Sequence, residues 1–203
     1  MTITARAALA DAAARFSFSA TARLDAELLL AHALGITRER LLLTLGDHTA
    51  PPAFAALVER RARHEPVAYL TGTRAFWTID LDVAPGVLIP RADSETLIEA
   101  AVAHFAGTAG PKRVLDLGTG SGALLLAALD QWPGARGVGI DASPAALAIA
   151  GTNAARIVPG RATIAAGGWD GTGEAFDLIL CNPPYIERAA ALPPEVADYE
   201  PAS

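Results

Sequence analysis

VLDLGTGSG, at residues 114–122, joins a short apolar run to a glycine-rich loop and decides the fold. The run Val114–Leu117 is typical of a buried strand, and the glycines allow a sharp turn and a close backbone approach to a ligand. A helix over 121–131 should follow, with unpaired N–H groups in its first turn. The loop also satisfies the loose dinucleotide pattern G-x-G-x-x-G/A, so it does not identify the ligand by itself.

Strands and helices continue to alternate after this loop. Apolar runs predict strands at 137–140, 162–165 and 176–181, and helical spacing predicts a helix over 144–156. Alternating elements of this length are typical of a parallel sheet with crossover helices. We therefore expect an α/β domain in this half of the chain.

The N-terminal part has a different character. Residues 4–65 show helical spacing and predict four helices, the last ending in the basic group Arg60, Arg61 and Arg63. We interpret these arginines as a solvated helix end, with a partner-binding patch as the alternative. Residues 76–83 alternate and predict a strand or hairpin, so we place the domain boundary at 75–90.

Composition excludes several classes of protein. The 203 residues carry a net charge of −6, which gives no global reason to bind nucleic acid. The single cysteine, Cys181, excludes an internal disulfide and cysteine-built metal sites, and the four histidines lack paired ligand spacing. We expect no metal site, no membrane span and no signal peptide, and these features favour a cytoplasmic protein.

Two acidic residues flank the expected ligand site. Asp141 ends the second predicted strand, where an acid typically binds ribose hydroxyls. The alternative for Asp141 is a helix cap, for which Ser143 competes. Asp116 lies just before the glycines, where it would oppose a pyrophosphate but suits a cationic amino group. This favours S-adenosylmethionine over a dinucleotide.

Asn182-Pro183-Pro184-Tyr185 follows the fourth predicted strand. The two prolines stop the strand and stiffen the turn, so Asn182 is held at the carboxyl end of the sheet, where ligands bind. The Asn182 side chain and the Pro183 carbonyl would then form a pair of acceptors for an NH2 group. The alternative is that these four residues form only a turn.

With both motifs identified, the chain resembles the PrmC/HemK family of protein-(glutamine-N5) methyltransferases that act on peptide chain release factors. The resemblance covers nearly the whole chain, and LIPR at 88–91 together with NPPY at 182–185 is its most specific part. It implies a helical substrate-recognition domain over 1–74, a β-hairpin linker over 75–90 and a class I, Rossmann-like, S-adenosylmethionine-dependent domain over 91–203. The acceptor would be the glutamine of a Gly-Gly-Gln motif, which places the protein in translation termination.

The resemblance also assigns roles to individual residues. Trp169 would flank the adenine of the cofactor, and Asn182 would contact both cofactor and substrate. Asn182, Pro183 and Tyr185 would be catalytic, and Pro184 would help them frame the glutamine amide. The remaining cofactor-binding residues would be Gly118, Thr119, Gly120, Ser121, Gly122 and Asp141.

The chain departs from the family pattern in three respects, of which the first is Cys181 in place of the family's usual small hydroxyl residue. Gly168 stands where the family commonly has an acid, which removes a hydrogen bond to the adenine. The family also continues through three more strands after the fourth, so this chain resembles a truncated member with its last strands missing. Such a sheet would expose an apolar edge, and we expect the 203-residue form to aggregate or to be inactive alone.

Two other functions remain open at this point. The same Asn-Pro-Pro-Tyr turn suits any NH2 group on a planar system, so a nucleic-acid methyltransferase acting on adenine or cytosine is the main alternative. The acidic composition argues against it, and direct nucleic-acid binding is not expected. The second alternative is an inactive fragment that only binds.

Overall fold

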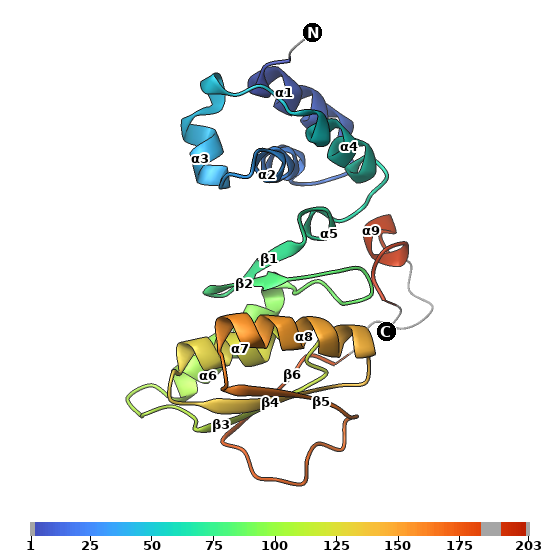
Figure 1. The fold of residues 1–203 in the computed structure, drawn as a ribbon. Helices are drawn as coiled ribbons and strands as arrows, with labels where there is room; N and C mark the ends of the chain where they lie inside the picture. The colour runs from blue at the N-terminus through green and yellow to red at the C-terminus, as the bar shows by residue number, and fades with distance from the viewer. Residues whose placement is uncertain (1–2, 184–191, 202–203) are drawn as a thin grey trace. The chain divides into compact units, whose positions relative to one another are not determined.

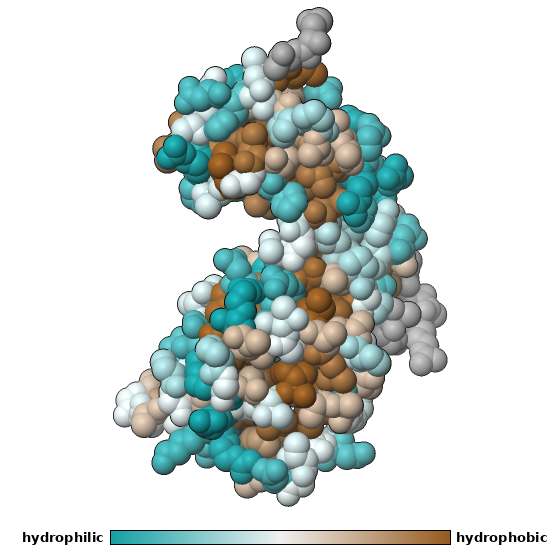
Figure 2. Space-filling view, viewed as in Figure 1, coloured by the Kyte–Doolittle hydropathy of each residue, from teal (hydrophilic) through white to brown (hydrophobic). Residues whose placement is uncertain are grey.

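The computed structural model describes residues 3–183 and 192–201 and divides into two compact units, Met1–Thr71 and Gly72–Ser203. Each unit has its own hydrophobic core, and apolar side chains also reach the surface of both (Figure 2). The order of elements confirms the predicted α/β class with a helical N-terminal region. No helix within the described residues is long and apolar enough to cross a membrane.

The first unit consists of short helices (Figure 1). Threonine hydroxyls cap two of them, because Thr4 Oγ1 accepts from Ala7 N and Thr37 Oγ1 accepts from Arg40 N. Gly35 ends the second helix with a φ of 67°, a conformation that favours glycine. The elements are α1 Ala5–Arg15, α2 Ala22–Leu34, α3 Arg38–Leu43, η1 Leu45–Asp47, α4 Pro52–Arg61 and α5 Val67–Thr71.

A buried ion pair links α2 to α4 within this unit. Two nitrogens of Arg61 donate to Asp25 Oδ2, at 3.0 and 2.8 Å, and only 3% of Arg61 is exposed. The hydroxyls of Ser19 and Thr21 also donate to the Asp25 carboxylate. The solvated interpretation of Arg61 is therefore wrong, because its guanidinium group is buried against Asp25. The helical pattern could not indicate this, since Asp25 lies 36 residues earlier in the sequence.

The second unit is built on a four-stranded parallel sheet in the order β5-β4-β3-β6. Its strands are β3 Arg113–Leu117, β4 Arg136–Asp141, β5 Ala162–Ala166 and β6 Leu178–Cys181. Its helices are α6 Glu95–His104, α7 Ala123–Gln131, α8 Pro144–Ile157 and α9 Pro194–Ala197, with the turn η2 Ala92–Ser94 before α6. Helix α7 starts later than predicted because Gly120 and Gly122 have φ values of 57° and 89°.

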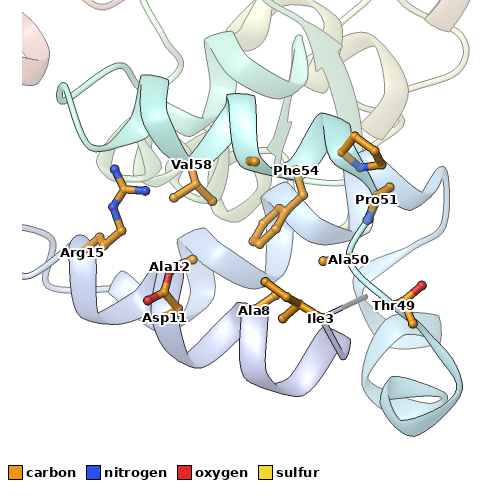
Figure 3. A pocket seen from close by; sticks show the side chains of 12 residues that line it. Ile3, Ala8, Asp11, Ala12, Arg15, Thr49, Ala50, Pro51, Phe54 and Val58 are labelled. Carbon is orange, nitrogen blue, oxygen red and sulfur yellow. The ribbon is translucent and has the colours of Figure 1, made fainter. Parts of the chain in front are cut away.

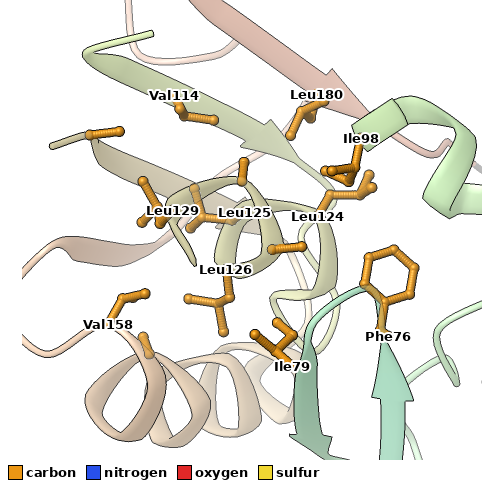
Figure 4. Close-up of a cluster of buried hydrophobic side chains, with 14 of the residues drawn as sticks. Phe76, Ile79, Ile98, Val114, Leu124, Leu125, Leu126, Leu129, Val158 and Leu180 are labelled. Carbon is orange, nitrogen blue, oxygen red and sulfur yellow. The ribbon is translucent and has the colours of Figure 1, made fainter. Parts of the chain in front are cut away.

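The predicted hairpin packs with the second unit. Strands β1 Thr73–Phe76 and β2 Ile79–Asp82 pair in antiparallel register, and Phe76 and Ile79 join the core formed around α7 (Figure 4). Asn153 of α8, which is fully buried, accepts from Asp82 N and donates to the carbonyls of Asp82 and Ser121. The segment predicted as a linker is thus attached to the helices that cover one face of the sheet (Figure 1).

Strand β3 lies at the centre of the site's geometry. The chain runs outward from β3 to β4 and β5, and then returns to place β6 on the other side of β3. Such a reversal of strand order leaves a crevice at the carboxyl ends of the two strands that flank it. The loops that follow β3, β4 and β6 therefore meet at one edge of the sheet.

Candidate functional site

The glycine loop after β3 is held by its own backbone. The amides of Gly118 and Thr119 both donate to Ile140 O at 2.9 Å, and Gly122 N donates to Thr119 O at 2.8 Å. Gly118, Gly120 and Gly122 all have positive φ values, which side chains other than glycine rarely adopt. The loop is therefore a rigid feature of the sheet edge.

Asp141 closes the second side of this loop. Its Oδ2 accepts from Gly120 N at 2.8 Å, and its Oδ1 accepts from Ser143 N at 2.9 Å. Ser143, and not Asp141, caps α8, because its hydroxyl accepts from Ala146 N. Each carboxylate oxygen of Asp141 retains a lone pair for a hydroxyl group of a ligand.

Asp116 is the strongest electrostatic anomaly of the site. Its carboxyl group is 1% exposed, and burial raises its pKa to about 6, with the nearby Asp141 charge acting in the same direction. Hydrogen bonds from Thr119 Oγ1 and Leu125 N to Oδ2 oppose this rise. Asp116 Oδ1 and Ser121 Oγ are buried without a hydrogen-bond partner among the described residues.

The corner after β6 brings Asn182 to the same edge. Asn182 Nδ2 donates to Ser94 Oγ at 3.1 Å, a contact between residues 88 positions apart. Asn182 and Ser94 line a small recess of about 50 Å³ together with Asp116 and the glycine loop. Pro184 and Tyr185 lie outside the described residues.

Most of the predicted residues line one cavity. It has a volume of about 370 Å³, within the usual range of small-molecule sites. Its walls include Gly118, Gly120, Asp141, Trp169, Asn182 and Pro183. Thr119 and Ser121 line the adjoining recess, while Gly122 lines neither space and is the N-cap residue of α7.

Trp169 lies against the glycine loop. A Cβ atom added to Gly118 would come within 2.9 Å of Trp169 Cη2, so the ring can occupy this position only because residue 118 is a glycine. Trp169 is 56% exposed, which is unusual for a large aromatic residue and leaves much of its ring open to a ligand.

Several lining residues had no predicted role in the site. Arg91 belongs to a quoted motif, and its Nη2 contacts both carboxylate oxygens of Glu200 at 2.8 Å. Ser94, three residues after Arg91, lines the adjoining recess. Glu200 and Val196 come from the segment around α9, and no local signal linked that segment to the glycine loop.

A second cavity, of about 570 Å³, lies between α1 and α4 of the first unit (Figure 3). Apolar side chains such as Phe54 and Val58 dominate its walls, and Arg15 at its edge pairs with Glu59. This cavity lacks the glycine loop and the buried carboxyl group that the smaller cavity has. Nor do residues 3–183 and 192–201 bring together three or more His, Cys, Asp or Glu side chains as a metal site requires.

The sequence matches two known family patterns. The methyltransferase small domain matches residues 92–197, just over half of the chain and the whole of the parallel sheet. The chain belongs to the methyltransferase small domain family. The PrmC N-terminal domain matches residues 7–72, ahead of this methyltransferase small domain, so the resemblance to the PrmC/HemK family is confirmed.

Relatives of this methyltransferase small domain protein include curated proteins named release factor glutamine methyltransferase. The one from Rhodospirillum rubrum is 45% identical over 89% of this chain and 57% of its own length. Those from Xylella fastidiosa and Mycolicibacterium smegmatis are 48% and 44% identical, over 81% and 90% of this chain and 61% and 66% of their own lengths. The chain thus spans between 57% and 66% of the length of these relatives.

Among solved structures, a SAM-dependent methyltransferase from Geobacter sulfurreducens in complex with S-adenosyl-L-homocysteine is 35% identical to this chain. The two share a TM-score of 0.31 over 38% of this chain and 29% of that one.

Proposed function

We propose that this protein transfers a methyl group from S-adenosylmethionine to the side-chain amide nitrogen of the glutamine in the Gly-Gly-Gln motif of peptide chain release factors. The observation that carries the proposal is the meeting of Asn182 and the glycine loop in one cavity. The names of the relatives support glutamine as the acceptor and do not favour a nucleic-acid substrate.

The residues of the cavity fit S-adenosylmethionine. Asp141 has lone pairs available for the ribose hydroxyls, and the exposed ring of Trp169 offers a flat surface for the adenine. The unpartnered Oδ1 of Asp116 would attract the ammonium group, which compensates the buried negative charge. When bound, this cofactor supplies a methyl group on a positively charged sulfur.

The amide nitrogen of the acceptor is a poor nucleophile because its lone pair is delocalised. The rotation barrier of a peptide amide, ~18–20 kcal/mol, shows the strength of this conjugation. In our proposal, the Asn182 side-chain oxygen and the Pro183 carbonyl accept the two N–H groups and favour a pyramidal nitrogen. Fixed polar groups of this kind are typically worth ~3–4 kcal/mol each.

Positioning must supply much of the remaining acceleration. Holding a nucleophile in line with its electrophile lowers a barrier by ~7–11 kcal/mol in favourable cases. The stiff Asn-Pro corner suits this role, because proline fixes the backbone beside Asn182. No base is needed before transfer, since the alkylated amide is acidic and releases its proton to water afterwards.

The organisation of the chain suggests a division of labour. We propose that residues 1–74 recognise the release factor, that 75–90 act as a linker, and that 91–203 bind the cofactor. The match of the first region to the PrmC N-terminal domain supports this assignment. Because release factors act on ribosomes, we propose the cytoplasm as the compartment.

Transfer of labelled methyl groups tests the proposal directly. A form of the protein as long as the curated relatives is incubated with labelled S-adenosylmethionine and, in separate reactions, with release factor, DNA or RNA. We expect label in the release factor only, and none when its Gly-Gly-Gln glutamine is replaced by alanine. Label in DNA or RNA would support the alternative methyltransferase, and calorimetric binding without any transfer would indicate a chain that only binds.

A further inference from the structure

We infer that Ser94 is a positioning residue that orients the Asn182 carboxamide toward the acceptor amide. The inference rests on the proposed function, and it names a residue that neither the motif analysis nor the relatives assign. Ser94 ends the turn η2, and Asn182 follows β6, so the fold brings together two segments 88 residues apart.

The hydroxyl of Ser94 is directed away from its usual role. Ser94 occupies the N-cap position of α6, where a serine side chain ordinarily accepts a hydrogen bond from the first helical turn. Here the side chain makes no such bond, and its Oγ instead accepts from Asn182 Nδ2 at 3.1 Å. The hydroxyl is therefore available to the site and is not needed to start the helix.

The turn keeps its shape by other contacts. Ser94 N donates to Arg91 O at 3.0 Å, and Thr96 Oγ1 donates to Asp93 O at 2.7 Å. Arg91 also holds the turn through its bidentate contact with Glu200, whose side chain is 2% exposed. Removing only the Ser94 hydroxyl should thus leave the backbone of the turn in place.

The polarity of the carboxamide explains what Ser94 contributes. A substrate NH2 group only donates, so it needs the Asn182 oxygen, and the opposite orientation would place two donors face to face. The Ser94 hydroxyl can accept or donate, and it holds the carboxamide plane in both cases. With Oδ1 facing the substrate, Ser94 supplies the acceptor that Nδ2 would otherwise lack inside the recess.

The first test compares three variants in the methyl-transfer assay with release factor. Ser94→Thr and Ser94→Val form a matched pair, because they differ only by a hydroxyl in place of a methyl group. We expect Ser94→Val and Ser94→Ala to lower kcat about tenfold, with an unchanged Kd for S-adenosylmethionine, and Ser94→Thr to stay within about threefold of the wild type. Thr108→Ala, which removes an exposed hydroxyl outside the cavity, serves as control.

A double-mutant cycle separates positioning from a structural role. If Ser94 acts only through Asn182, Ser94→Ala should cause no further loss in an Asn182→Ala background. Additive losses, or equal losses in the threonine and valine variants, would overturn the inference. A wild type that transfers methyl groups and a Ser94→Ala variant with the same kcat would overturn it as well, while the proposed function would stand.

A measurement that needs no activity completes the test. The side-chain amide signal of Asn182 in a ¹H–¹⁵N spectrum is identified by its disappearance in Asn182→Asp. We expect Ser94→Val, but not Ser94→Thr, to shift this signal and to speed its exchange with water. If the wild type transfers no methyl group, the proposed function fails, yet an unshifted signal in Ser94→Val would still refute the positioning contact and a shifted one would support it.

Discussion

The loop after β3 and the corner after β6 meet in one cavity, yet different kinds of contact hold them. Backbone hydrogen bonds to the neighbouring strand hold the loop, through Gly118 and Thr119 on Ile140 O. A side-chain hydrogen bond to a distant turn holds the corner, through Asn182 on Ser94 Oγ. The loop is thus encoded nearby in sequence, whereas the corner depends on the assembled domain.

Because the two regions are held differently, substitutions in the loop and in the corner should affect different properties of the protein. In our proposal the loop binds the cofactor, so substitutions there should change affinity and stability. The corner orients the reacting nitrogen, so substitutions there should change turnover. A substitution that violates this division would show that the two regions do not have separate roles.

Asn182→Ala should have the largest effect. Losing one oriented acceptor should lower kcat by ~10²–10³. The Kd for S-adenosylmethionine should rise much less, because the glycine loop and Asp141 remain. Single-turnover transfer to release factor and calorimetry measure the two quantities separately.

Unchanged turnover in this variant would disprove the amide clamp. A loss of cofactor affinity as large as the loss of turnover would instead make Asn182 part of the binding region. Asn153→Ala serves as the structural control, because this buried amide supports the loop through Ser121 O without lining the cavity.

The loop and the corner also differ in how far the sequence predicts them. The apolar run 114–117 and its glycines are local signals, and the strand and turn follow from them. The contact between Ser94 and Asn182 has no local signal, because it exists only when β6 pairs beside β3. The same holds for Arg61, which is buried against Asp25 of another helix.

The hairpin shows the same limit at the level of the whole unit. Its alternation predicts strands correctly, but its attachment depends on Phe76 and Ile79 entering a core formed by residues 124–129. That packing is long-range, so the sequence indicates a hairpin without indicating what it packs against. The structure divides the chain at Thr71 and Gly72, just before the hairpin.

Asp116→Asn should have the next largest effect, on stability. Burial raises the pKa of Asp116 to about 6 from its ordinary value of 3.8. Its stabilising contribution is therefore complete below pH 3.8, declines as the pH rises through 6, and is lost above it. The difference in the free energy of unfolding, variant minus wild type, should therefore rise by ~2–3 kcal/mol between pH 4 and pH 7.

Urea unfolding at several pH values measures this difference. Other acids, such as Glu27 and Asp177, have lowered pKa values and also make stability depend on pH. Comparing the variant with the wild type at the same pH removes their contributions from the difference. A difference that stays constant with pH would show that Asp116 is not the titrating group. Asp177→Asn serves as the matched control: the Asp177 carboxylate accepts from two backbone amides, which lower its pKa, so the variant should lose stability relative to the wild type as the pH rises, mainly below pH 3.8.

Gly118→Ala should produce a smaller effect, divided between stability and binding. The φ of 69° strains an alanine by ~1–2 kcal/mol, and its Cβ would meet the Trp169 ring at 2.9 Å. Because Trp169 is 56% exposed, the ring can move away, and its surface for the adenine is lost. Calorimetry should therefore show about a tenfold weaker affinity for S-adenosylmethionine.

Gly134→Ala provides the matched control, since nothing lies within 4 Å of the added Cβ and its φ is not positive. We expect the wild-type affinity there. In the double variant Gly118→Ala/Trp169→Ala, the loss of cofactor affinity should be less than the sum of the two single losses, because each substitution removes the same Trp169 ring from the adenine. A fully additive pair would contradict the contact between the loop and Trp169.

Trp169→Ala should have the smallest effect, and that effect should fall on cofactor binding alone. Stacking of an adenine on an aromatic ring is worth ~1–3 kcal/mol, but an exposed ring should lie at the lower end of this range, near a fivefold rise in Kd. Turnover at saturating cofactor should not change, because the Asn182 corner is intact. Trp169→Phe should recover most of the affinity, since it keeps a flat ring over Gly118. An unaltered affinity in calorimetry would remove Trp169 from the binding region, and a lowered kcat at saturation would mean that the loop region also positions the reacting atoms.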